Sequence, residues 1–169
     1  MIDSAYLRIL GLLAILGGGV RIVTSFVPWV DGSLALEAVA LGIDLCLLFG
    51  LTGFYVAFSA RLGAAGFVGY LVAASGIALI AGPDGEAFGI DIYQAGVAVI
   101  AAGLAVLSLI LLIRRIAPPA ALLWLGAIAA AVVGGALGYP GQAFAVAGAA
   151  FGAGFVAAGF STMRQAGKS

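Results

Sequence analysis

Long apolar runs fill this chain, and short polar or proline-containing turns interrupt them at fairly regular intervals. Each run is close to the length of about 20 mostly apolar residues with which an α-helix crosses a bilayer. The interruptions hold residues that end helices, among them Pro28, Gly82–Pro83 and Pro118–Pro119. The pattern predicts an all-α bundle of six transmembrane helices, over residues 5–27, 34–58, 64–81, 88–113, 120–137 and 142–163.

The composition agrees with a membrane protein and leaves little room for a second domain. Hydrophobic residues make up 64% of the 169 residues and charged residues only 8%, whereas soluble domains carry about 25% charged residues. The six predicted helices use up almost the whole chain. We therefore expect residues 1–169 to form a single transmembrane domain that is surrounded by the lipid bilayer.

Charged residues are distributed unevenly between the two ends of the predicted bundle. The turns after the first, third and fifth predicted helices each hold a proline, at Pro28, Pro83 and Pro140. An excess of Lys and Arg beside membrane spans marks the cytoplasmic side. We expect three helical hairpins with both termini in the cytoplasm, in a plasma membrane or a bacterial inner membrane. The basic residues at the cytoplasmic end are Arg8, Arg61, Arg114, Arg115, Arg164 and Lys168, and the acidic residues at the other end are Asp31, Asp84 and Glu86.

Three ionisable residues of the first two predicted helices lie at membrane depth: Arg21, Glu37 and Asp44. Such residues are costly in hydrocarbon and usually mark a functional site. With a rise of about 1.5 Å per residue, Arg21 lies about 9 Å below the outer boundary, Glu37 about 4.5 Å and Asp44 about 15 Å. Arg21 is therefore between the two carboxylates in depth, and its side chain is long enough to pair with either.

Other polar residues lie on the same helix faces as these charges. Thr24 and Ser25 follow Arg21 by about one turn, and Asp91 and Gln94 begin a polar stripe on the fourth predicted helix. We expect Asp44 to be protonated, paired with Arg21, or in contact with water or a cation. The sequence thus predicts one outward-facing site that binds a substrate or an ion, formed by Arg21, Thr24, Ser25, Glu37, Asp44, Asp91 and Gln94.

The residue types that are missing argue against an enzyme. The chain has no His, which is the commonest general base and metal ligand, and it has no Gly-rich phosphate loop followed by Lys. Asp44 and Asp91 differ in depth by about 10 Å, which is too far for two aspartates that share a proton. We predict no catalytic residue, no cofactor, no metal and no nucleic acid, and an intramembrane enzyme is the most distant alternative.

Small residues recur every four positions on the last predicted helix, as Gly148 and Gly152 and as Ala149 and Ala153. This spacing lets helix backbones approach closely in lipid. The face packs within the bundle or forms an interface with a second copy or another membrane protein.

Two classes of function fit these features. The first is a small transporter or solute-binding membrane subunit, whose site is a cavity lined by Arg21 and Asp44. The alternative is a non-catalytic accessory or assembly subunit of a larger membrane complex, which uses the small-residue face of the last helix. The sequence does not specify a substrate.

Overall fold

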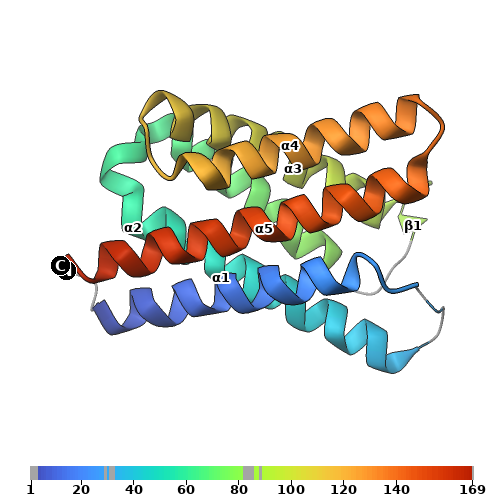
Figure 1. The fold of residues 1–169 in the computed structure, drawn as a ribbon, viewed down its shortest axis with the longest axis horizontal. Coiled ribbons are helices and arrows are strands. Elements are labelled where there is room, and N and C mark those ends of the chain that lie inside the picture. The colour runs from blue at the N-terminus through green and yellow to red at the C-terminus, as the bar shows by residue number, and fades with distance from the viewer. Residues whose placement is uncertain (1–3, 29, 31–32, 82–85, 88, 169) are drawn as a thin grey trace.

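Five helices and one small β-hairpin make up the described part of the chain (Figure 1). The computed structural model describes residues 4–28, 30, 33–81, 86–87 and 89–168. Each helix is long and apolar enough to cross a membrane, as expected for an all-α membrane protein. The elements are α1 (Ser4–Thr24), α2 (Leu34–Ile80), β1 (Glu86–Ala87), β2 (Ile90–Asp91), α3 (Ile92–Ile113), α4 (Pro118–Ala136) and α5 (Pro140–Ala166). Asp31, Gly82, Pro83 and Asp84, which mark predicted turns, lie outside the described residues.

Helix α2 is not straight. Its 47 residues would extend about 70 Å as a single rod, more than twice the hydrocarbon thickness of about 30 Å. At Gly63 the backbone is non-helical, with φ 66° and ψ −169°, a conformation that glycine adopts readily because it has no Cβ. Across this bend Tyr55 and Tyr70 stack with ring centroids 4.5 Å apart, and the Thr52 and Tyr70 hydroxyls share a hydrogen bond of 3.1 Å.

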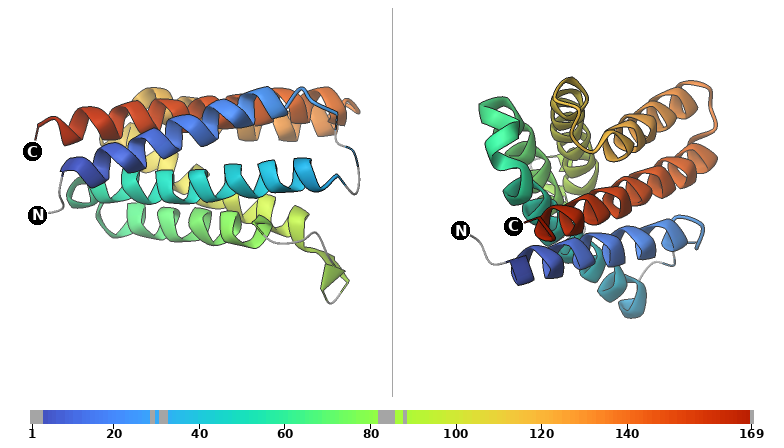
Figure 2. Two further views of the ribbon diagram at one scale, coloured as in Figure 1. Left: turned by 90° about the horizontal axis from the view of Figure 1, so that it is seen from below. Right: turned by 60° about the vertical axis from the view of Figure 1, so that its left-hand side comes forward.

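The chain therefore reverses direction within α2. In a straight helix, Thr52 and Tyr70 would be separated by about 27 Å along the axis. Figure 2 shows the second half of α2 running back beside the first half. Gly63 belongs to the connection that the sequence predicts between residues 58 and 64.

The observed helix ends differ from the predicted boundaries by up to four residues, and two of these differences have a local structural cause. The helix predicted from residue 88 begins at Ile92, because β1 and β2 pair ahead of it. The Asp91 carboxylate caps this helix by accepting a hydrogen bond of 3.0 Å from the backbone N–H of Gln94. The helix predicted to extend to residue 27 ends at Thr24. There the hydroxyls of Thr24 and Ser25 both donate to the carbonyl of Arg21, at 3.2 and 2.7 Å.

The helices form a closed ring. Each helix packs against the next one in the chain, and α5 returns to pack against α1. Glycines bring these two backbones together: a Cβ added at Gly152 would lie 2.5 Å from the carbonyl oxygen of Gly18, and one added at Gly159 would lie 2.5 Å from that of Gly11. Helices α2 and α3 meet in the same way, because a Cβ added at Gly76 would lie 2.6 Å from a backbone nitrogen of α3.

The small-residue face of α5 is therefore used at least partly inside the chain. Gly148 and Gly152 are buried, and each faces residues of α1. Ala149 and Ala153 are half-buried. An interface of these alanines with a second copy or another membrane protein stays a prediction.

Aromatic side chains fill the core at the end of the bundle where α2 bends. Trp124 of α4 is fully buried, with its ring centroid 6.0 Å from that of Phe54 and 5.3 Å from that of Phe155. Phe58 lies one turn beyond Phe54, with ring centroids 5.0 Å apart. We call Phe54, Phe58, Trp124 and Phe155 the aromatic plug.

The two ends of the bundle carry different connections. Both termini, the bend of α2 and the α3–α4 connection lie at one end, and the β-hairpin and the α4–α5 connection lie at the other (Figures 1 and 2). We call the first end the basic end. Its residues Arg8, Arg61, Arg114, Arg115, Arg164 and Lys168 are all exposed.

Candidate functional site

Arg21 lies in the last turn of α1, where α1 faces α2 and α5. The residue is half-buried. Its Nε atom is buried and has no hydrogen-bond partner in the described part of the protein. A Cβ added at Gly148 of α5 would lie 3.8 Å from this Nε, an ordinary contact, but only 2.5 Å from the Ser25 hydroxyl oxygen, so the glycine leaves room for Ser25.

A cavity of about 60 Å³ opens beside Arg21 between the end of α1 and the beginning of α2. This volume holds a few water molecules or one small polar group. Arg21 is its charged lining residue, and Thr24 adds a hydroxyl that already donates to a backbone carbonyl. The remaining lining residues are Val27, Pro28, Leu36, Val39, Ala40 and Ile43.

Asp44 lies one turn after Ala40 on α2, follows the lining residue Ile43, and is half-buried. Arg21 is the charged group whose electric field acts on its carboxylate. Within the described residues, no ion pair or side-chain hydrogen bond joins these two side chains. Asp44 itself is not one of the residues that line the cavity.

The other predicted site residues lie in three places. Ser25 lies beside Arg21 and against Gly148 of α5. Glu37 is exposed in the first turn of α2. Asp91 and Gln94 are exposed at the beginning of α3, where the Asp91 carboxylate caps the helix. The structure thus brings Arg21, Thr24, Ser25 and Asp44 together and leaves Asp91 and Gln94 outside this group.

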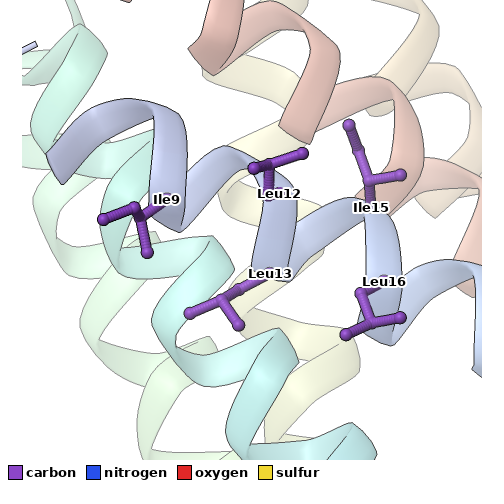
Figure 3. Close-up of a pocket in the computed structure, with 5 residues that line it drawn as sticks. All are labelled: Ile9, Leu12, Leu13, Ile15 and Leu16. Carbon is purple, nitrogen blue, oxygen red and sulfur yellow. The ribbon is translucent and has the colours of Figure 1, made fainter. Parts of the chain in front are cut away.

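A larger hollow, of about 420 Å³, lies along the surface of α1. Figure 3 shows the five side chains that line it, and all of them come from this one helix. They are the aliphatic residues Ile9, Leu12, Leu13, Ile15 and Leu16. The hollow has no polar side chain with which to bind a solute, and its surface suits hydrocarbon.

Two contributors to the site were not predicted from the sequence. Gly148 was assigned to helix packing, although it lies against the Ser25 side chain of the site. The aromatic plug was not identified, although its rings join α2, α4 and α5 in the core. The four-residue spacing between Gly148 and Gly152 was a visible signal, but only the pairing of α5 with α1 shows which side chain it accommodates.

Comparison of the chain with known protein families, with curated proteins and with solved structures finds no match. The geometry of Arg21 and its surroundings therefore carries the functional argument alone.

Proposed function

We propose that the protein is a small membrane transporter or solute-binding subunit, and that Arg21 binds the anionic group of a small solute. The observation that carries this proposal is a half-buried guanidinium in a membrane-spanning helix, whose Nε has no partner among the described residues. A buried charge without a counter-charge is strongly unfavourable. A solute carboxylate or a similar anion in the adjoining cavity supplies that counter-charge.

Asp44 is a second ionisable residue near Arg21, and its protonation responds to the bound anion. Arg21 acts on the Asp44 carboxylate through its electric field, without an ion pair or hydrogen bond between these two described side chains. A bound anion cancels part of this positive field, and Asp44 then takes up a proton or a cation. The aromatic plug lies between this site and the basic end, so the solute enters from the opposite end.

We further propose six membrane crossings with both termini in the cytoplasm, in a plasma membrane or a bacterial inner membrane. The reversal at Gly63 supports two crossings within α2. The concentration of exposed Lys and Arg at one end supports the orientation. Single cysteines introduced by Arg61→Cys and Lys168→Cys, each with Cys46→Ser, should resist a membrane-impermeant thiol reagent in intact cells. Gly141→Cys should react, and the reverse labelling would contradict this orientation.

Solute binding is tested by thermal unfolding of the purified protein in detergent with chloride, phosphate, acetate or succinate. At least one anion should raise the unfolding temperature, because a ligand at 100 times its dissociation constant stabilises by about 2.7 kcal/mol. Arg21→Gln should remove the shift, whereas Arg164→Gln, which changes an exposed arginine at the basic end, should keep it. An equal shift in both variants would contradict a role for Arg21.

A further inference from the structure

Two helices of this protein end in the same kind of turn but place different residues at its critical position. At the end of α4, the Tyr139 amide donates to the Gly134 carbonyl at 2.9 Å, and Gly138 adopts φ 79°. At the end of α3, the Ile116 amide donates to the Leu111 carbonyl at 2.8 Å. Both are Schellman motifs, in which one residue takes the left-handed conformation.

In α3 that left-handed residue is Arg115, with φ 54°. Glycine adopts this conformation without a steric penalty, whereas any residue with a Cβ is strained there. The chain holds 27 glycines and uses Gly63 and Gly138 at other left-handed turns. An arginine at this position therefore lowers the stability of the fold compared with glycine. The role of the arginine then lies in its side chain, because this is what glycine lacks.

The surroundings hold this arginine at a fixed place. Ile116, the next residue, is 1% exposed and anchors the connection in the core. Ala117 is also left-handed, with φ 42°, and Pro118 begins α4 directly afterwards. Arg114 and Arg115 themselves are exposed. Two exposed arginines that are consecutive in the sequence thus lie at the basic end.

Arg61 lies at the same end, two residues before the bend at Gly63. Helices α2 and α3 are in close contact, because a Cβ added at Gly69 would lie 2.8 Å from the Leu107 amide nitrogen. The bend of α2 and the α3–α4 connection lie at one end of the bundle in Figure 1. Within the described residues, no carboxylate forms an ion pair with Arg61, Arg114 or Arg115.

The surface next to these arginines is apolar. Ile113 is 73% exposed and Leu109 is 53% exposed, and both precede Arg114 along α3. A ligand with an anionic head and a hydrocarbon tail matches this arrangement, because the head would meet the arginines and the tail would meet the apolar side chains. Arginine also suits a phosphate group, because its planar guanidinium donates two parallel hydrogen bonds.

We propose that Arg115, together with Arg114, binds the phosphate of an anionic phospholipid whose acyl chain lies along Ile113 and Leu109. This site is separate from Arg21 and stands whether or not Arg21 binds a solute. Each basic residue beside an anionic membrane surface strengthens binding about fivefold.

The test compares the wild type and Arg115→Gly in nanodiscs of phosphatidylcholine alone and in nanodiscs that also contain phosphatidylglycerol. Phosphatidylglycerol should raise the unfolding temperature of the wild type. In phosphatidylcholine, Arg115→Gly should unfold at a higher temperature than the wild type, because glycine relieves the left-handed strain. The same variant should bind phosphatidylglycerol about fivefold more weakly and should lose most of the lipid-dependent rise.

Arg164→Gln is the matched control, because it removes an exposed arginine at the same end from a different helix. It should keep the phosphatidylglycerol effect. Equal losses in both variants would show a diffuse attraction to the membrane surface and would overturn the proposal, as would no loss in Arg115→Gly. Inorganic phosphate is tested on the detergent-purified protein. If it stabilises the wild type and Arg115→Gly abolishes this effect, the assignment to a lipid is overturned.

Discussion

Gly18 and Gly19 are neighbours in α1, but only Gly18 faces another helix. A Cβ added at Gly18 would collide with the carbonyl oxygen of Gly152 and would lie 3.0 Å from both Phe155 Cβ and the Val156 amide nitrogen. A Cβ added at Gly19 would have no neighbour within 4 Å. Gly18→Ala and Gly19→Ala therefore make the same chemical change on adjacent residues of one helix and differ in what the new methyl group meets.

The expected magnitude follows from the contact between α1 and α5. A Cβ added at Gly18 would collide with the Gly152 oxygen and would lie 3.0 Å from Phe155 Cβ, whereas an ordinary contact begins at about 3.4 Å, so the two helices must move apart. Overpacking of this kind costs about 1–3 kcal/mol. The better helix propensity of alanine returns up to about 1 kcal/mol. Gly18→Ala should lose about 1–2 kcal/mol, whereas Gly19→Ala should be neutral or gain up to about 1 kcal/mol.

Reversible unfolding of the three proteins in the same detergent measures both values. The informative quantity is the difference between the two variants, because helix propensity and the added methyl group are common to both. If Gly18→Ala proves as stable as Gly19→Ala, the close approach of α1 and α5 is wrong. The position of Gly148 beside Arg21 depends on the same contact between the two helices, and it would then be wrong as well.

Three further substitutions and one control test local geometry by thermal unfolding. Ala117→Gly should stabilise the protein by about 1 kcal/mol because it relieves a left-handed alanine, and a loss of stability would contradict this backbone conformation. Asp91→Ala should cost about 1 kcal/mol through the lost helix cap. Gln94→Ala should cost little, because the backbone N–H that donates to Asp91 remains. Tyr70→Phe should cost about 0.6 kcal/mol by removing the hydrogen bond to Thr52, and an unchanged stability would argue against the bend of α2.

The general fold could be predicted because each helix carries its own signal. The length of an apolar run and the residues that end it are local properties, so the approximate extents of the helices follow from the sequence. The contact between α1 and α5 is different, because it joins residues more than a hundred positions apart. A glycine at a helix face indicates that a backbone approaches there, but it does not specify which helix.

The candidate site was predictable only where a charge interrupts an apolar run. Arg21 and Asp44 stand out for this reason, and the structure places both near one cavity. Asp91 gave the same signal but caps α3 instead, because the β-hairpin shifts the beginning of that helix. Arg115 resembled an ordinary basic residue after a membrane span, and its left-handed backbone is visible only in three dimensions.

The closure of the ring between α1 and α5 has a consequence for biosynthesis. A ribosome delivers α1 to the membrane first and α5 last of the described helices, so Gly18 and the buried side of Arg21 have no final partner during most of translation. Until α5 arrives, the arginine remains in contact with lipid, water or the insertion machinery. Nascent chains stalled before α5 should therefore be more easily extracted from the membrane or degraded than chains stalled after it, and Arg21→Leu should reduce that difference.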